Sequence, residues 1–220
     1  MRAKGAEYER MIREEFAPKL EELKAEAQAQ GWLQPKVVYG YFPCHAAGNE
    51  LVILDPLQRK TEVARLRFPR QPDERLLCLA DYFRAEPGSD VCALQVVTVG
   101  DHASRLAEEA NARGDYARGL FLHGLAVEVA EALAEHWHRV VKAELGLGPE
   151  QGKRYSPGYP SWPELSDQAQ LWRLLEPDRT IGVTLTEAHQ MVPEQSTSAI
   201  VLHHPEAVYF TIRGQSVLAG

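Results

Sequence analysis

Apolar side chains recur every three or four positions early in the chain, which predicts helix over residues 6–30. The positions that share a face are Tyr8, Met11, Ile12 and Phe16, followed by Leu20, Leu23 and Ala27. Proline suits the first turn of a helix, so a second helix is expected to begin near Pro18. Gly31 is expected to end it.

The longest periodic stretch predicts a helix over residues 116–145, ended by Gly146 and Gly148. The spacing of its large apolar residues predicts which face meets the core. That stripe is Leu122, Leu125, Val129, Leu133, Trp137 and Val140.

Two shorter helices are also expected. One runs from an Asp101 cap through Leu106 and Ala110 to Gly114. The other covers residues 166–175, with Ser166 as its cap and Pro177 following it. Its inward-facing residues should be Leu171, Trp172 and Leu175.

Elsewhere the pattern changes to short apolar or alternating runs, which predict β-strands. These are residues 37–42, 51–54, 64–68, 91–100, 182–187, 198–204 and 207–212. The run 91–100 is the richest in β-forming residues and is expected at the centre of the sheet. A tight HPEA turn (204–207) should join the last two strands as a hairpin. The order of elements favours an α+β fold with a largely antiparallel sheet.

Composition narrows the class of protein. No linker or repeat divides residues 1–220, of which 45% are hydrophobic and 25% charged, so one domain with an N-terminal helical segment (1–30) is expected. A net charge of −7 argues against nucleic-acid binding, which requires a basic face. No apolar run approaches a bilayer span, and the N-terminus reads as a charged helix rather than a signal peptide. We therefore expect a cytoplasmic protein that uses neither nucleic acid nor membrane.

Histidine and cysteine positions predict neither a metal site nor a nucleophile. His136 and His138 are two apart on a helix and point in different directions, so they cannot chelate one ion. The three cysteines form no CxxC pair. Cys44 lies beside His45, but sequence neighbours seldom form a working dyad, and a buried core thiol is the better interpretation. No metal site is expected.

Three glutamates share one side of the long predicted helix: Glu128, Glu131 and Glu135. A run of charge on a helix is usually the solvated face. A glutamate angled into a cleft could instead hold a cationic ligand. Periodicity does not choose among the three.

The segment RYSPGYP (154–160) combines one permanent charge with a stiff, aromatic loop. Arg154 offers a planar fork suited to a carboxylate. Gly158 would let backbone groups approach a ligand, and Tyr159 adds a ring that can stack on a base. Composition alone favours a Pro-Gly turn with packed tyrosines over a ligand clamp.

At this loop the chain resembles the S-adenosylmethionine-binding activation domain of cobalamin-dependent methionine synthase. RYSPGYP has that family's RxxxGY pattern. Similar segments occur in the same order on either side: VVYGYFPCHAAGNEL, CLADYF, the AEALAEHWH helix and LTEAHQMVPEQSTSAIVLHHPEAVYF. The likeness covers about residues 30 to 213.

The resemblance implies a single curved α+β domain with a twisted, largely antiparallel sheet flanked by helices. It implies that S-adenosylmethionine binds here and gives its methyl group to reactivate cob(II)alamin. The cobalamin would be carried by a separate cobalamin-binding domain, and a flavodoxin-type donor would supply the electron. The chain lacks the other regions of a methionine synthase, so it is not expected to make methionine alone. A free-standing protein and a piece of a longer synthase are both open.

Residue by residue, the resemblance implies that Arg154 binds the methionine carboxylate and Asp81 its amino group. Gly158 and Tyr159 would hold the adenosine part, and Tyr209 would line the site near the sulfonium. Among the three glutamates, Glu131 matches an acidic position near the methyl-transfer face.

The chain departs from the family in the GPEQGK segment before Arg154, whose Glu150 does not align with the family's upstream glutamate, in YPSWP, and at two further positions. Val127 stands where the family often has a second acid, and Phe210 where a tyrosine is commoner. The last two departures favour an alternative, a non-catalytic docking domain for a corrinoid or flavodoxin-type partner that does not use S-adenosylmethionine. An unrelated small-molecule sensor is a third interpretation.

Overall fold

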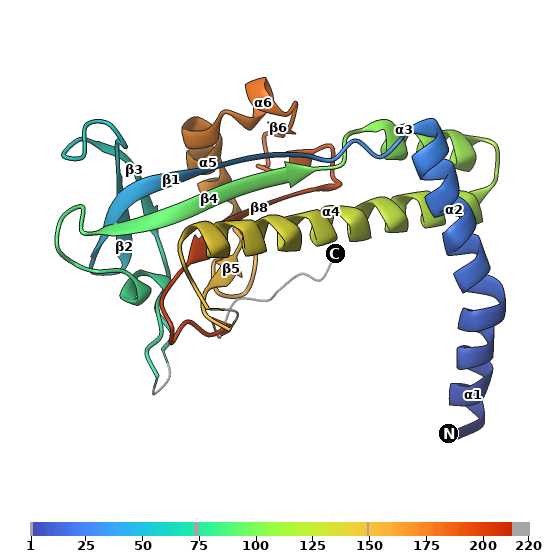
Figure 1. Ribbon diagram of the computed structural model, residues 1–220, viewed down its shortest axis with the longest axis horizontal. Coiled ribbons are helices and arrows are strands. Elements are labelled where there is room, and N and C mark those ends of the chain that lie inside the picture. Colours follow the sequence, from blue (N-terminus) through green and yellow to red (C-terminus); the bar gives the residue numbers. More distant parts are fainter. Residues whose placement is uncertain (1, 73–74, 149, 213–220) are drawn as a thin grey trace.

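A computed structural model describes residues 2–72, 75–148 and 150–212, and its centre is a six-stranded sheet (Figure 1). Every pair of neighbouring strands is antiparallel, and the order is β3-β2-β1-β4-β8-β5. The strands are β1 (Lys36–Ala47), β2 (Glu50–Leu54), β3 (Glu62–Arg67), β4 (Asp90–Thr98), β5 (Lys153–Tyr155) and β8 (Ser196–Leu202). With helices packed on this sheet, the predicted α+β class is confirmed.

Side chains of β4 alternate between two differently covered faces of the sheet. Leu94 and Val96 point into the largest apolar core, which also receives Leu171 and Leu175 of helix α5 (Gln168–Leu175). Ala93 lies on the opposite face, under helix α4 (Tyr116–Glu144). The central position predicted for this strand is confirmed, since β1 and β8 pair on its two sides.

Helix α4 buries a stripe of small residues rather than the predicted stripe of large ones. Leu122 and Leu125 are buried as expected, but Val129, Leu133, Trp137 and Val140 are only partly buried. The buried positions that continue the stripe are Ala126, Ala130, Ala134, His138 and Val141. Alanine side chains let a helix backbone lie close to a sheet, so the larger residues pack at its margins. The contact is close enough for the Gln95 amide to donate to the backbone oxygen of Ala134 at 3.2 Å.

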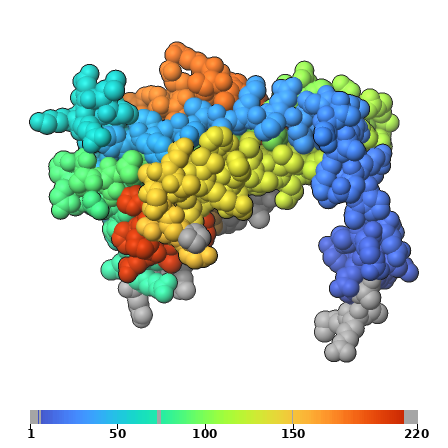
Figure 2. All heavy atoms as spheres, viewed as in Figure 1, coloured from blue at the N-terminus to red at the C-terminus, as the bar shows by residue number. Residues whose placement is uncertain are grey.

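The N-terminal helical segment runs on without a break as α1 (Arg2–Met11), a π-helical turn η1 (Ile12–Phe16) and α2 (Ala17–Gln30). Pro18 lies in the first turn of α2, as predicted, and Gly31 ends the helix with a left-handed φ of 64°. Leu23 and Ala27 of α2 belong to an apolar cluster with residues of α3 and α4, and Glu26 of α2 pairs with Arg118 of α4 at 2.5 Å. Helix α1 projects from the body, and Tyr8 is 60% exposed (Figures 1 and 2).

The remaining helices are short. Asp101 occupies the cap position of α3 (His102–Ala112) as predicted, although its carboxylate pairs with Arg105 rather than with backbone. Before α5 a 3-10 turn, η3 (Leu165–Asp167), contains Ser166, so Asp167 and not Ser166 takes the cap position. The other short elements are η2 (Leu79–Tyr82) and α6 (Pro177–Thr180).

Two predictions about the C-terminal strands are wrong. The strand expected over 182–187 shrinks to β6 (Thr184–Leu185), which pairs with β7 (Met191–Val192). Residues 207–212 form no strand, although the turn before them is present, with Ala207 N–H donating to His204. Strand β8 already pairs with β4 and β5, so it has no free edge for a hairpin partner.

No helix among the described residues has an apolar stretch long enough to cross a membrane. Within the same ranges, no group of three or more His, Cys, Asp or Glu side chains is arranged to hold a metal ion.

Candidate functional site

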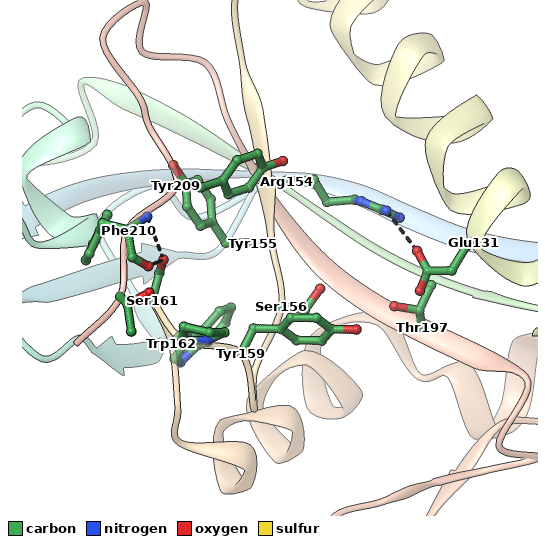
Figure 3. A pocket seen from close by; sticks show the side chains of 12 residues that line it. Glu131, Arg154, Tyr155, Ser156, Tyr159, Ser161, Trp162, Thr197, Tyr209 and Phe210 are labelled. Atoms are coloured by element: carbon green, nitrogen blue, oxygen red, sulfur yellow. Dashed lines mark hydrogen bonds and ion pairs between the residues drawn. The ribbon is translucent and has the colours of Figure 1, made fainter. Parts of the chain in front are cut away.

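A cavity of about 360 Å³ opens where helix α4, strand β5, the loop after β5 and residues 209–211 meet (Figure 3). Four places in the sequence therefore build one recess: α4, β5 with the loop that follows it, Thr197 of β8, and residues 209–211. Its lining residues are Glu131, Arg154, Tyr155, Ser156, Tyr159, Pro160, Ser161, Trp162, Thr197, Tyr209, Phe210 and Thr211.

Arg154 enters the cavity from β5, where it is paired with Val201 of β8. Its Nη2 atom donates to Oε2 of Glu131 at 3.0 Å (Figure 3). The arginine side chain is only 17% exposed, and its Nη1 atom is buried without a hydrogen-bond partner among the described residues. A buried donor without an acceptor is costly, so this guanidinium has spare capacity for an anion.

Helix α4 brings only one of its three candidate glutamates into the cavity lining. Glu131 is half-exposed and faces Arg154. Glu128 is exposed, and Glu135 contacts His138 and Arg139. Periodicity did not separate the three glutamates, but the orientation of the helix against the sheet places Glu131, and neither of the other two, in the cavity lining.

The loop that follows Arg154 is a tight turn and part of the cavity at once. Gly158 has φ of 87°, a backbone conformation that favours glycine, and its N–H donates to Trp162 O at 2.7 Å. The Trp162 ring is fully buried and donates to Asp167 Oδ2 at 2.7 Å. This anchor fixes the loop, while Tyr159 remains 58% exposed at the rim.

Gly158 itself lines an adjoining recess rather than the main cavity. That recess has a volume of about 970 Å³ and shares Tyr159 and Pro160 with the main cavity. The two hollows therefore adjoin at Tyr159 and Pro160.

Residues 207–212 cover the cavity from the other side. The hydroxyl of Tyr155 donates to Val208 O at 2.7 Å, and the ring of Tyr209 lies against that of Tyr155 with centroids 5.3 Å apart. Burial raises the pKa of Tyr155, so its hydroxyl keeps its proton and remains a donor. Ser161 also donates to Phe210 O. Tyr209 is 65% exposed and forms the outer rim.

Asp81 does not line this cavity. It lies in η2 and accepts two hydrogen bonds from Arg70, at 2.5 and 2.7 Å. Arg70 also donates to Leu76 O and Asn49 Oδ1, so the arginine is held from three directions. Four of the predicted site residues line this cavity: Glu131, Arg154, Tyr159 and Tyr209. A fifth, Gly158, lines the adjoining recess.

Several lining residues were missed from the sequence. Tyr155 and Ser156 lie within the segment 154–160, and Ser161 and Trp162 directly follow it, so all four could have been included. Thr197 lies on β8, where nothing in a run of small polar and apolar residues marks it as facing a cavity.

Fold and cavity together define an α+β domain whose cavity is lined by a guanidinium, a carboxylate and exposed tyrosine rings. The family model described as vitamin B12 dependent methionine synthase, activation domain, matches residues 8–215. The chain belongs to this family, and the resemblance seen in the sequence is confirmed.

The methionine synthases that match this chain are much longer than it is. A methionine synthase of Mycobacterium tuberculosis (strain ATCC 25618 / H37Rv) is 40% identical over 235 residues, covering 94% of this chain and 20% of that protein. One from Mycobacterium leprae (strain TN) is 36% identical, covering 94% of the chain and 19% of the protein. The chain thus spans about a fifth of the length of these relatives.

A solved structure described as the MetH reactivation domain bound to AdoHcy matches with a TM-score of 0.84 and 27% identity. The match covers 93% of this chain and 72% of that one.

Proposed function

We propose that the chain binds S-adenosylmethionine in the cavity around Arg154 and presents its methyl group for the reactivation of cob(II)alamin on a cobalamin-binding domain. Family membership and the likeness to a reactivation domain bound to AdoHcy support this function. The structural observation that supports it most directly concerns Arg154. Its guanidinium lines the cavity and is mostly buried, and its Nη1 atom has no hydrogen-bond partner among the described residues.

The chemistry requires positioning more than acid or base catalysis. A corrinoid on the partner domain, reduced by one electron from a flavodoxin-type donor, would supply the nucleophile; the methyl group would pass to it, and the electron pair of the broken C–S bond would stay on sulfur to leave AdoHcy. A sulfonium methyl group is already activated, so the chain has only to hold it in line.

Each predicted residue has a role in this proposal. Arg154 would hold the methionine carboxylate, while Tyr159 and the backbone at Gly158 would hold the adenosine part across the two adjoining hollows. Tyr209, at the exposed rim, would lie beside the sulfonium. Glu131 would offset the sulfonium charge near the methyl-transfer face, in competition with its pairing to Arg154.

Asp81 would take the amino group only if its contacts with Arg70 are shared or opened. The pair is partly solvent-accessible, with side chains 31% and 46% exposed, so water can replace part of its bidentate contact. Ligand binding would then exchange one charged partner of Asp81 for another.

Calorimetric titration of the purified chain with S-adenosylmethionine and with AdoHcy tests the proposal. Arg154→Ala should weaken both by about 30- to 150-fold, the loss of one charge-assisted, bidentate contact. Arg154→Lys keeps the charge without the fork and should fall in between. Arg139→Ala is the matched control, because that arginine is 75% exposed on the same helix as Glu131 and lines no part of the cavity.

Absence of heat at millimolar ligand, with a folded chain by circular dichroism, would exclude the binding function. Capture of a cobalamin-binding domain that does not depend on S-adenosylmethionine would favour the docking alternative instead.

We also infer that residues 1–220 act as one unit in the cytoplasm, with 1–30 as their helical segment. The three cysteines are buried and free, which suits a reducing compartment. The relatives are named methionine synthases, a class of methyltransferase, and this chain would act as a module of such an enzyme.

A further inference from the structure

Residues 209–211 line the cavity and belong to no strand, so groups outside a sheet ladder must bond the backbone of this segment. Hydroxyl groups do so at the residue before Tyr209. Val208 O accepts from the Tyr155 hydroxyl at 2.7 Å, and Val208 N–H donates to the Tyr82 hydroxyl oxygen at 3.4 Å. Burial raises the pKa of both tyrosines, so the two hydroxyls keep their protons.

At the residue after Tyr209, one serine holds both backbone groups. The Ser161 hydroxyl donates to Phe210 O, and Phe210 N–H donates back to Ser161 Oγ at 3.3 Å (Figure 3). A hydroxyl has one donor and two acceptor positions, so a single serine can serve both groups. Ser161 is buried and stands in YPSWP, where the chain departs from the family pattern. An alanine at this position would make neither contact.

Tyr209 is thus held through the backbone of both its neighbours, while its ring faces the cavity. The ring is 65% exposed, and its centroid lies 5.3 Å from that of the Tyr155 ring. Because so much of the ring is exposed, packing against the protein does little to fix it. Its place at the cavity therefore depends on where the backbone at Val208 and Phe210 is held.

We propose that Ser161 is a positioning residue for Tyr209: its two hydrogen bonds to Phe210 fix the Tyr209 ring at the cavity and so set the preference of the cavity for a cationic over a neutral ligand. The inference rests on the proposed function, since it takes S-adenosylmethionine as the cationic ligand and AdoHcy as the neutral one. An aromatic face attracts a cation that lies within about 6 Å of the ring centroid. A ring on a loosened backbone would lose part of this attraction, whereas the neutral sulfur of AdoHcy gains little from it.

A double-mutant cycle separates positioning from packing. The affinities for S-adenosylmethionine and AdoHcy are measured by calorimetry for the full chain, Ser161→Ala, Tyr209→Ala and the double variant. Tyr209→Ala should lower the ratio of the first affinity to the second by about two- to fivefold, as expected for one cation–π contact at an exposed site. Ser161→Ala should lower this ratio by about twofold, and should lower it no further when added to Tyr209→Ala.

Ser166→Ala is the matched control and should leave the ratio unchanged, because the Ser166 hydroxyl bonds Glu164 and the residue lines no part of the cavity. An unchanged ratio in Ser161→Ala, even with both ligands weakened, would overturn the inference. An equal drop with and without the Tyr209 ring would also overturn it, since the effect would then come from general loosening of the cavity.

Two measurements without ligand test the hydrogen bonds themselves. In wild type, the Phe210 amide should be protected from hydrogen exchange although it lies outside any strand, and fast exchange would overturn the inference even if Ser161→Ala does not fold. In Ser161→Ala, the NMR signals of the Tyr209 ring should move toward those of free tyrosine, and unchanged signals would overturn it. If wild type binds neither ligand while both results are as expected, the proposed function fails and the role of Ser161 in holding Tyr209 stands.

Discussion

The guanidinium of Arg154 and the carboxylate of Glu131 meet at 3.0 Å, although 23 positions separate them in the sequence. One comes from the edge strand β5 and the other from helix α4, so their contact ties the sheet edge to the helix at the cavity. The residue proposed to hold a carboxylate is thus already paired with one. A ligand that binds Arg154 must share it with Glu131.

This pairing predicts that Glu131→Gln affects the binding of two related ligands to different extents. S-adenosylmethionine (AdoMet) carries a sulfonium cation that the Glu131 carboxylate would stabilise, whereas the sulfur of AdoHcy is neutral. Because Glu131 is half-exposed, its removal should change the ratio of the two affinities in favour of AdoHcy by about two- to fivefold. Glu128→Gln on the exposed face of the same helix should leave the ratio unchanged. Equal weakening of both ligands by Glu131→Gln would mean that Glu131 acts only through Arg154.

Asp81→Asn tests the assignment of the ligand's amino group. The variant should bind AdoHcy about tenfold more weakly, because a charged hydrogen bond is lost. It should bind an analogue without the α-amino group as tightly as wild type does. Asp178→Asn, on the exposed helix α6, serves as a control in the same calorimetric titrations. If Asp81→Asn keeps wild-type affinity for AdoHcy, Asp81 serves only to hold Arg70.

Tyr155→Phe should destabilise the fold through one hydrogen bond. The lost hydroxyl leaves Val208 O without its donor, so the free energy of unfolding should fall by about 1 kcal/mol, measured by urea denaturation. Tyr159→Phe changes an exposed ring and should stay within about 0.5 kcal/mol of wild type. Equal stabilities of the two variants would show that Tyr155 does not hold residues 207–212.

Two glycine substitutions should act in opposite directions. Gly158→Ala places a side chain where φ is 87° and where its Cβ would meet Leu165 at 3.0 Å, so it should cost about 1–3 kcal/mol. Gly124→Ala lies inside helix α4 with open space around the new Cβ and should stabilise the chain by about 0.5–1 kcal/mol. Thermal unfolding of both variants checks the pair. A neutral Gly158→Ala would mean that the loop relaxes without strain.

Local patterns in the sequence predicted where helices and strands occur better than they predicted which elements pack or pair with one another. Helix α4 was found because its periodicity extends over 29 residues, but the pattern did not show that the small residues Ala130 and Ala134 form its inner face. The alternation of residues 207–212 is typical of a strand, yet a strand also needs a free edge, and β8 has none. Strand β5 has three residues, too few to give a pattern.

The site shows the same limit. Arg154 and Tyr159 stand in a short segment whose composition is unusual, so the sequence alone drew attention to them. Periodicity did not separate Glu131 from Glu128 and Glu135; the resemblance selected Glu131, and the rotation of α4 against the sheet is what brings it into the cavity lining. Asp81 illustrates the reverse case: the resemblance assigns it to the ligand, while the folded chain pairs it with Arg70.

The short strand that carries Arg154 also bears on how the chain behaves at high concentration. Exposed sheet edges invite other chains to add strands, and β5 offers only three residues for such pairing. At the opposite edge β3 presents Arg65, paired with Glu50 and Glu62, and a charged edge likewise discourages strand addition. Neither edge of the sheet therefore offers another chain a long, uncharged strand to pair with.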